Sequence, residues 1–396
     1  MNSMSYIEKL LDRGEVELIQ IGKIAEIKRG TSITKKKVTP GDIPVIAGGR
    51  TPAYYHDESN REGQTIVIAG SGAYAGFVSW WEQPIFVSDA FTVKPHDCLI
   101  PKYCFYWLQS MQQQIHELKS GGGVPHVYPR NVAPLEIPIP CAENPEKSLQ
   151  IQAEIVRILD AFTSLTAELT AELTARKKQY NYYRDKLLSF EDGEVERITL
   201  MNACDYVDYR GKTPVKTNDG VFLVTAKNIR MGYIDYETSQ EFISPDDYST
   251  VMRRGIPKLG DVLITTEAPC GFVAQVDRDD IALAQRVIKY RSKNNKRLSN
   301  SFIKHYLLGG EFQKKLRRAA TGSTVKGIKG SKLHQLTIPI PKPEEQARIV
   351  TILDKFDALT NSITEGLPRE IELRQKQYEY YRDLLLSFPK PDEQAA

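Results

Sequence analysis

The sequence predicts an α/β (α+β) protein in which two domains are joined by two long antiparallel helices, in a pseudo-two-fold, circular organisation. Three observations support this prediction: the length of 396 residues, an internal repeat and two long stretches with helical periodicity. At about 100–200 residues per domain, a chain of this length accommodates two to four domains. With 41% hydrophobic and 26% charged residues, the chain can bury substantial cores and is neither fibrous nor disordered.

The internal repeat consists of sequence blocks that recur in the second half of the chain. Residues 137–140 match 338–341, residues 152–162 match 346–356, and residues 176–190 match 374–388. A truncated third copy opens the chain, where residues 6–11 and 14–17 echo residues 183–188 and 193–196. The repeated blocks are connectors, whereas the segments between them have diverged. This favours one scaffold that presents two different recognition surfaces over a plain duplication without functional symmetry. If the N-terminal fragment packs near the C-terminal helix, the chain closes on itself.

The repeat also sets the expected domain boundaries. We predict an N-terminal helical tail and partial repeat over 1–16, a first domain over 17–140, a central helix over 141–192, a second domain over 193–341, a C-terminal helix over 342–390 and a tail over 391–396.

The two long helices are indicated by apolar residues at alternating intervals of four and three, which is typical of a coiled-coil seam. The first seam comprises Ile151, Ile155, Ile158, Phe162, Leu165, Leu169, Tyr180, Tyr183 and Leu187, and the second comprises Ile349, Ile352, Phe356, Leu359, Ile363, Tyr378, Tyr381 and Leu385. Pro145 and Pro343 are start signals, and Gly366 with Pro368 should kink or restart the second helix. Forty residues make a helix of about 60 Å, so antiparallel packing of the two helices is favoured over each one capping only its own domain.

A tandem repeat of four residues lies in the middle of the first helix. Its two copies, Thr166–Leu169 and Thr170–Leu173, have the sequence Thr-Ala-Glu-Leu. Each copy adds about 6 Å, close to one helical turn, and shifts the heptad phase. Thr166, Leu169, Thr170 and Leu173 therefore mark a candidate spacer, and an ordinary Ala-rich helix is the alternative.

Each domain is expected to contain short strands and helices. Thr65–Ala69 and Gly260–Thr265 are strand-like, and a Gly-Phe-Val sequence follows each of them. Helices are expected over 102–118 and 301–318. The sequences Arg29-Gly30-Thr31 and Arg210-Gly211-Lys212 are expected to mark equivalent positions of the two domains.

Several classes of protein are excluded by what the sequence lacks. The longest weakly polar stretch, Ile66–Trp81, is interrupted by glycines and is shorter than a membrane span, and residues 1–11 have no signal-peptide core. The five cysteines form no Cys-x-x-Cys pair, which argues against a zinc ribbon or a disulfide scaffold. We therefore expect a soluble cytoplasmic protein.

Catalytic motifs are also missing from the sequence. There is no phosphate-binding P-loop, no amino-methyltransferase tetrapeptide and no His-Glu-x-x-His, and the six histidines have no metal-ligand spacing. Asp261 and Glu267 are conceivable as a nuclease pair, but a carboxylate beside a strand is usually structural. We expect neither a catalytic residue nor a metal ligand.

Basic residues give the stronger signal. Residues 205–335 carry a net charge of +9 and residues 17–135 carry +2, whereas residues 136–204 and 336–396 carry −4 and −3. Lysines and arginines on glycine-rich loops suit contacts to phosphates and base edges. The candidate DNA-binding residues are Arg29, Lys35, Lys36, Lys37, Arg50, His126, Tyr128, Arg130, Arg210, Lys212, Lys227, Arg230, Arg286, Lys314, Lys315, Arg317, Arg318, Ser323, Lys326, Lys329 and Lys332.

The connector sequences resemble those of the specificity (S) subunit of type I restriction–modification enzymes, in particular the type IC-like subgroup with tandem Thr-Ala-Glu-Leu repeats. The resemblance covers the whole chain and is most specific at the Ile-Pro-Ile-Pro segments, at Leu159–Phe162 and Leu353–Phe356, and at the Gln-Tyr-x-Tyr-Tyr-Arg-Asp segments. It implies two target-recognition domains, each of which reads one half of a bipartite double-stranded DNA sequence. It also implies that the helices form the spacer.

The resemblance further implies partners in the bacterial cytoplasm. Two methyltransferase (M) subunits would dock on the helices, and restriction or motor (R) subunits would join through them. S-adenosylmethionine, ATP and Mg would then belong to those subunits, with no cofactor on this chain. The tyrosines of the two helices cannot all face one seam, so we expect some to dock the M subunits, the alternative being packing on their own domain. They are Tyr180, Tyr182, Tyr183, Tyr378, Tyr380 and Tyr381.

Two other classes of function stay open on the sequence. One is a self-contained site-specific DNA nuclease or methyltransferase, and the other is a scaffold that binds no DNA. Activity of the chain without partners would favour the first class, and absent or salt-insensitive DNA binding by the assembled complex would favour the second.

Overall fold

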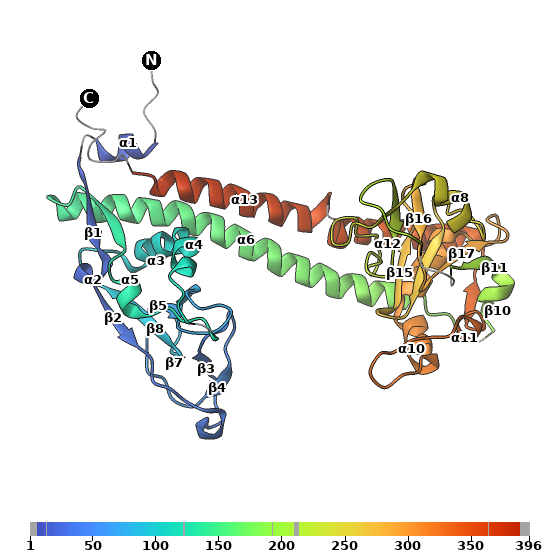
Figure 1. Ribbon diagram of the computed structural model, residues 1–396, viewed down its shortest axis with the longest axis horizontal. Coiled ribbons are helices and arrows are strands. Elements are labelled where there is room, and N and C mark those ends of the chain that lie inside the picture. The colour runs from blue at the N-terminus through green and yellow to red at the C-terminus, as the bar shows by residue number, and fades with distance from the viewer. Residues whose placement is uncertain are drawn as a thin grey trace, which may run out of the picture. The chain divides into compact units, whose positions relative to one another are not determined.

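The computed structural model describes residues 6–12, 14–121, 123–191, 193–209, 214–362 and 364–388 (Figure 1). The chain divides into two compact units. Unit 1 comprises Met1–Ala167 and Glu372–Ala396, and unit 2 comprises Glu168–Ile371. Each unit contains one sheet-bearing domain and a part of each long helical region, so the expected α/β class is confirmed.

Unit 1 is built on a four-stranded antiparallel sheet in the order β2-β8-β5-β6. Its strands are β2 (Ala25–Arg29), β8 (Ala90–Pro95), β5 (Thr65–Ala69) and β6 (Val78–Trp81). A smaller sheet joins β4 (Tyr54–His56), β3 (Ile43–Ile46) and β7 (Phe86–Val87), and β1 (Val16–Gln20) pairs with β9 (Glu136–Pro140). The helices of the domain are α1 (Tyr6–Leu11), α2 (Ile21–Ile24), α3 (Pro101–Ser110), α4 (Gln112–Glu117) and α5 (Pro129–Val132), with a 3₁₀ turn η1 (Lys35–Lys37).

Unit 2 repeats this plan. Its main sheet has the order β11-β17-β14-β15, with β11 (Cys204–Asp208), β17 (Val287–Ser292), β14 (Val262–Thr266) and β15 (Cys270–Gln275). The smaller sheet joins β13 (Phe242–Ile243), β12 (Val221–Val224) and β16 (Ile281–Leu283), and β10 (Glu196–Thr199) pairs with β18 (Thr337–Ile340). The helices are α7 (Leu200–Ala203), η2 (Pro245–Asp247), α8 (Tyr248–Val251), α9 (Asn300–Leu308), α10 (Gly310–Ala319) and α11 (Gly330–Leu333).

The strand pairing in the two main sheets shows which residues of one unit are equivalent to which residues of the other. Ile68 lies opposite Phe91 in unit 1, and Ile264 lies opposite Ile288 in unit 2. Since Arg29 also lies opposite Phe91 and Asp208 lies opposite Ile288, the equivalent of Arg29 is Asp208. The expected equivalence of Arg29 and Arg210 is therefore wrong, because a similar local sequence does not fix strand register, and residues 210–212 themselves lie outside the described residues.

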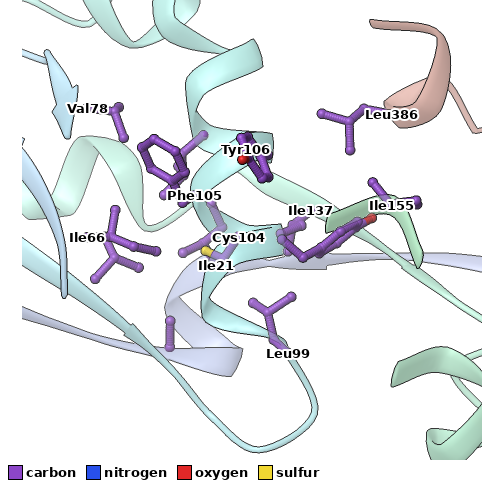
Figure 2. Close-up of a cluster of buried hydrophobic side chains, with 14 of the residues drawn as sticks. Ile21, Ile66, Val78, Leu99, Cys104, Phe105, Tyr106, Ile137, Ile155 and Leu386 are labelled. Atoms are coloured by element: carbon purple, nitrogen blue, oxygen red, sulfur yellow. The ribbon is translucent and has the colours of Figure 1, made fainter. Parts of the chain in front are cut away.

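The core of unit 1 gathers elements from the whole length of the chain (Figure 2). Ile66 of β5, Tyr106 of α3 and Ile155 of the central helix belong to one buried cluster. Ile7 of the N-terminal helix and Leu386 of the C-terminal helix belong to it as well. Full burial of such a side chain contributes about 1.5–3 kcal/mol. The two ends of the chain thus share one core, as expected for a chain that closes on itself.

The long helices are α6 (Pro145–Leu187), α12 (Pro343–Asn361) and α13 (Gly366–Leu386). The starts at Pro145 and Pro343 are confirmed, and so is the restart at Gly366. Gly366 has a φ of +73°, and a Cβ there would stand 2.3 Å from the carbonyl oxygen of Ala358. Because only glycine tolerates both constraints, the helix ends and begins again at this point.

The helices pair inside each unit through aromatic residues. In unit 1 the Phe162 ring of α6 stacks on Tyr381 of α13, with 5.3 Å between centroids. In unit 2 the Phe356 ring of α12 stacks on Tyr183 of α6 at 5.9 Å. The phenylalanine of each repeat thus meets the tyrosine of the other, as an antiparallel pair requires.

Two details of the helices differ from expectation. The helices expected over 102–118 and 301–318 are each divided in two, at Met111 and at the extended Gly309. Leu159 and Leu353, which are not seam positions, are fully buried, whereas the adjacent seam residues Ile158 and Ile352 are half-buried, because this part of each long helix packs on its own domain. The seam position Ile363 lies outside the described residues.

Candidate nucleic-acid interface

Each unit has a hollow at the same place in its fold, beside a glycine-containing loop. In unit 1 it has a volume of about 570 Å³ and lies against the ends of β2, β5 and β8. In unit 2 it has a volume of about 460 Å³ and lies against the ends of β14 and β17. The loop comprises residues 120–121 and 123–128 in unit 1 and residues 321–329 in unit 2.

The two loops have the same backbone frame. The N–H groups of Ser120 and His126 each donate to the other's carbonyl oxygen at 2.9 Å, and Thr321 and Gly327 do the same at 2.8 and 2.9 Å. The next N–H group ties each loop to the main sheet, since Val127 donates to Gly70 at 3.0 Å and Ile328 donates to Thr266 at 2.9 Å. We call each loop with its adjoining hollow a cradle: residues 70–71, 88–91, 120–121 and 123–129 in unit 1, and residues 266–267, 285–288 and 321–330 in unit 2.

Four of the predicted residues come together at the cradle of unit 1. The guanidinium groups of Arg29 and Arg130 lie 5.4 and 4.9 Å from the centroid of the Tyr128 ring. The His126 ring stacks on the same tyrosine at 5.8 Å. Arg29 and Arg130 are exposed, so their N–H groups face solvent while the aromatic ring holds them in place.

The other predicted residues of unit 1 lie elsewhere in the domain. Lys35, Lys36 and Lys37 form the 3₁₀ turn η1, and all three are exposed. Arg50 packs over the rings of Tyr74 and Phe77, at 4.8 and 5.4 Å from their centroids. These cations are accessible, but they are not members of the cradle.

In unit 2 most predicted cations gather on α10 and on the cradle loop. Lys314, Arg317 and Arg318 are exposed on α10, while Lys315 is bound to Glu311 at 2.6 Å. Ser323, Lys326, Lys329 and Lys332 are exposed on the loop and at the start of α11, which packs against α10. Together these residues form a basic surface beside the cradle.

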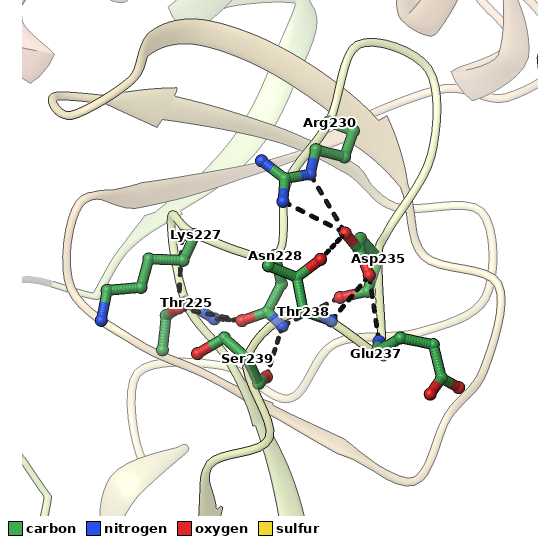
Figure 3. Close-up of polar contacts among 8 residues, drawn as sticks. All are labelled: Thr225, Lys227, Asn228, Arg230, Asp235, Glu237, Thr238 and Ser239. Carbon is green, nitrogen blue, oxygen red and sulfur yellow. Dashed lines mark hydrogen bonds and ion pairs between the residues drawn. The ribbon is translucent and has the colours of Figure 1, made fainter. Parts of the chain in front are cut away.

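Arg230 is already engaged within its own loop (Figure 3). Its guanidinium donates two hydrogen bonds to the Asp235 carboxylate, at 3.2 and 3.1 Å. The pKa of Asp235 is lowered to about 2, first by the hydrogen bond from the Thr238 hydroxyl and then by those from the backbone N–H groups of Thr238 and Glu237 and from Arg230. Lys227 of the same loop is exposed and lies 3.9 Å from Glu241. Arg230 thus has a structural partner, whereas Lys227 is accessible. Arg210 and Lys212 lie outside the described residues.

The cradles also contain charged residues that sequence reasoning missed. Asp89 in unit 1 accepts a hydrogen bond from the Ser71 hydroxyl. At the equivalent place in unit 2, the predicted Arg286 lies 3.7 Å from Glu267. From the sequence alone, these residues could be found only by their positions next to the predicted strands. Those positions identify equivalent residues in the two units only once the pairing register of the strands is known.

The imagined nuclease pair of Asp261 and Glu267 is not assembled. The Asp261 carboxylate is buried and accepts two hydrogen bonds of 2.6 Å from Arg291. Glu267 is instead the partner of Arg286. A buried carboxylate in a bidentate arginine pair serves the fold, as the structural interpretation expected.

The spacer repeat lies within the unbroken helix α6. The hydroxyls of Thr166 and Thr174 donate to the carbonyls of Phe162 and Thr170, at 3.0 and 2.9 Å. Leu169 and Leu173 are half-buried.

The six tyrosines separate into inner and outer residues. Tyr180 and Tyr378 are buried, and the Tyr378 hydroxyl donates to Gln109 at 2.6 Å. Tyr182 and Tyr380 are 61% and 64% exposed, and each stands edge-on to the neighbouring Tyr183 or Tyr381 at 5.3 Å. Tyr183 and Tyr381 are 39% and 36% exposed, so these four outer tyrosines offer a surface to a partner, whereas Tyr180 and Tyr378 do not.

The described residues contain no group of three or more His, Cys, Asp or Glu side chains that could hold a metal ion. Among the same residues, no helix has the length and apolar character needed to cross a membrane.

A family model described as "Type I restriction modification DNA specificity domain" matches residues 13–179 and 254–373. The chain is 38% identical over 434 residues to the type I restriction enzyme EcoR124I/EcoR124II specificity subunit of Escherichia coli, with 99% of both chains covered. It is 31% identical to the EcoprrI specificity subunit of Escherichia coli, with 92% of this chain and 93% of the relative covered.

Solved structures show the same fold. The S subunit of a type I restriction–modification system from M. genitalium aligns with a TM-score of 0.60 at 17% identity, covering 96% of this chain and 98% of that one. A chain from work on complex assembly and conformational transition of the type I R-M system aligns with a TM-score of 0.56 at 16% identity, covering 94% and 98%.

Proposed function

Since the chain belongs to the family of type I restriction–modification specificity subunits, we propose that each of its two domains reads one half of a bipartite double-stranded DNA target. The observation that carries this proposal is the cradle, because one backbone frame occurs twice with different side chains. Because the two cradles have the same backbone, both domains would approach the duplex in the same way. Because their side chains differ, each domain would select different bases.

Phosphate contacts would come from the exposed cations around the cradles. Lys314, Arg317, Arg318 and the loop lysines of unit 2 supply an accessible basic surface, and Lys35–Lys37 supply one in unit 1. Such contacts fix position and affinity but carry no sequence information.

The long helices would set the unread spacer between the half-sites. Support comes from the continuity of α6 through both Thr-Ala-Glu-Leu copies. Since each copy adds about 6 Å of helix, the number of copies would change the spacer in steps of one or two base pairs.

Methyltransferase docking is the third part of the proposal. Tyr182 and Tyr380 occupy equivalent positions of the repeat and are both largely exposed, so two like M subunits would bind two like surfaces. Restriction or motor subunits would join through the M subunits, in the bacterial cytoplasm.

This chain would supply position and no chemistry. S-adenosylmethionine, ATP and Mg would be bound by the partner subunits, and methylation would require an adenine flipped into an M-subunit pocket. The chain itself would bind no cofactor.

The test is reconstitution with purified M subunits. We expect M subunits alone to methylate no defined sequence, the chain alone to show neither methylation nor Mg-dependent cleavage, and the mixture to methylate a defined target. Activity of the chain alone would instead support a self-contained nuclease or methyltransferase. A mixture that binds DNA weakly and without salt dependence would support a scaffold that does not read DNA.

A further inference from the structure

Each cradle carries one charged side chain at the same backbone position. Asp89 directly precedes Ala90, which lies opposite Ala69, and Arg286 directly precedes Val287, which lies opposite Thr265. The carbonyl oxygens of both residues accept the same sheet-edge hydrogen bond, from Gly70 at 3.0 Å and from Thr266 at 2.8 Å. Asp89 and Arg286 are therefore equivalent residues of opposite charge.

Their partners are equivalent as well. Ser71 follows Gly70 and donates its hydroxyl hydrogen to Asp89. Glu267 follows Thr266, and its carboxylate lies 3.7 Å from the Arg286 guanidinium. The cradle of unit 1 thus presents a hydrogen-bond acceptor, and that of unit 2 presents a donor.

Both side chains are exposed on rigid supports. Asp89 stands between the buried Ser88 and Ala90, and Arg286 stands beside the buried Val287. The backbone of Arg286 has a φ of +69°, a region that residues other than glycine seldom occupy. Such conformations persist where the surrounding structure imposes them, and they are concentrated at functional sites.

The chemistry of the two groups suits different bases. An ionised aspartate only accepts hydrogen bonds, whereas an arginine only donates them, from a planar fork. In the major groove, cytosine N4 and adenine N6 are donors, and guanine offers the two acceptors O6 and N7. The Arg286–Glu267 pair is about half exposed, so a base edge can replace the carboxylate at small cost.

We propose that Asp89 and Arg286 are specificity-determining residues, one for each half-site. Arg286 selects a guanine in the half-site of unit 2. Asp89 selects a base with an amino group in the major groove, cytosine or adenine, in the half-site of unit 1. This inference rests on the proposed function of the two domains.

The test compares Arg286→Ala, Asp89→Ala and a control, Arg348→Ala, in the complex assembled with M subunits. Arg348 is an exposed arginine on α12 that is paired with Glu345, outside the recognition domain. Each complex methylates a DNA library with randomised sequence, and the methylated molecules are sequenced. Thermal unfolding and assembly with M subunits establish that each variant is folded.

We expect Arg286→Ala to lose about ten-fold or more of the preference for guanine at one position of one half-site. We expect Asp89→Ala to lose the preference for cytosine or adenine at one position of the other half-site. Arg348→Ala should keep every preference. The inference is overturned if either variant loses activity uniformly on all sequences, if the relaxed base is of the other class, or if the preferences are unchanged. A wild-type complex without two half-sites would overturn the proposed function itself, and so the two failures are distinguishable.

Discussion

In each unit, a glutamine of the long helix is hydrogen-bonded to the segment just before α3 or α9, and we call this contact the joint. The joint is the same in the two units, whereas the cradles differ. In unit 1 the Gln152 amide accepts a hydrogen bond from the Ile100 N–H at 2.8 Å and donates to Cys98. In unit 2 the Gln346 amide accepts from the Ser299 N–H at 2.9 Å and donates to Arg297 at 2.8 Å. The cradles share only the backbone, and their charged residues are reversed.

This difference distinguishes the residues that the fold requires, at the joint, from the residues that we propose contact the DNA target, at the cradles. The joint is buried, so its polar atoms must be paired and the same amide is retained. The charged cradle side chains Asp89 and Arg286 are exposed, so they can change without loss of the fold. Divergence without loss of stability is what a reader of variable sequences needs.

The largest effect should follow from exchanging one domain. Replacing residues 205–335 with the corresponding block of another family member should change one half-site completely and leave the other unchanged, because each cradle is built within one unit. Sequencing of DNA methylated by the assembled complex measures this. A change in both half-sites would break the separation of the two units as independent readers.

The spacer tests the helices apart from the cradles. Inserting a third Thr-Ala-Glu-Leu copy after Leu173 should lengthen the unread spacer by one or two base pairs, at about 3.4 Å each, with both half-sites unchanged. Thr170→Ala preserves the helix length and is the control that should keep the original spacer. Altered bases in place of altered spacing would refute the role of the helix as a ruler.

The joint should be equally sensitive in both units. Gln152→Ala and Gln346→Ala each leave buried backbone groups without partners, which should cost about 2–4 kcal/mol of unfolding free energy. Gln113→Ala and Gln375→Ala are the matched controls, since both side chains are exposed and each donates a hydrogen bond to a glutamate one helical turn away. Denaturant unfolding measures the four variants, and a large loss in only one unit would contradict the equivalence of the joints.

Phosphate contacts should weaken binding without changing the sequence preference. Changing Lys35, Lys36 and Lys37 to Ala should lower affinity for DNA and flatten the dependence of log affinity on log salt by about 0.9 for each lysine on a phosphate. Binding titrations at several salt concentrations measure the slope. The exposed pair Lys177 and Lys178 on α6 serves as control. An unchanged slope means that the lysines of η1 do not contact phosphate.

The smallest expected effect is a pH dependence confined to unit 2. Tyr106 hydrogen-bonds Asp160 in unit 1, and His305 hydrogen-bonds the equivalent Asp354 at 2.7 Å in unit 2. Burial lowers the pKa of His305, against the opposing effect of that hydrogen bond, and Lys304 also lowers it. The folded state therefore keeps His305 neutral, while the unfolded chain takes up a proton near pH 6.5.

His305 thus contributes stability that is present above about pH 6.5 and is lost as the pH falls below that value. Thermal unfolding at pH 7.5 and pH 5.5 should show a larger acid destabilisation for the wild type than for His305→Tyr, which copies unit 1. The pKa of Asp354 is lowered by His305 and Lys304 despite its burial, so this carboxylate titrates in a more acidic range. An equal acid response of both proteins would contradict the neutral state of His305.

The sequence predicted the connectors well and the cradles poorly. The helix starts at Pro145 and Pro343 and the restart at Gly366 were predictable, because proline and glycine act locally on the backbone. The break at Met111 was not predictable, because no such residue marks it.

The site shows the same contrast. Clusters of Lys and Arg were visible in the sequence as candidate cations, but the partner of Arg230 is Asp235, on the returning segment of a loop that sequence spacing does not reveal. The equivalence of Asp89 and Arg286 could not be predicted, because it is defined by strand register and by a shared backbone conformation, while the side chains around the two residues differ.

The central claim is that two domains with the same backbone fold recognise different half-sites. The most direct test is to sequence the molecules of a randomised DNA library that the wild-type complex with M subunits methylates. We predict two short half-sites of different sequence, separated by a spacer of fixed length in which every base is accepted. A single continuous target, or two identical half-sites, would contradict it.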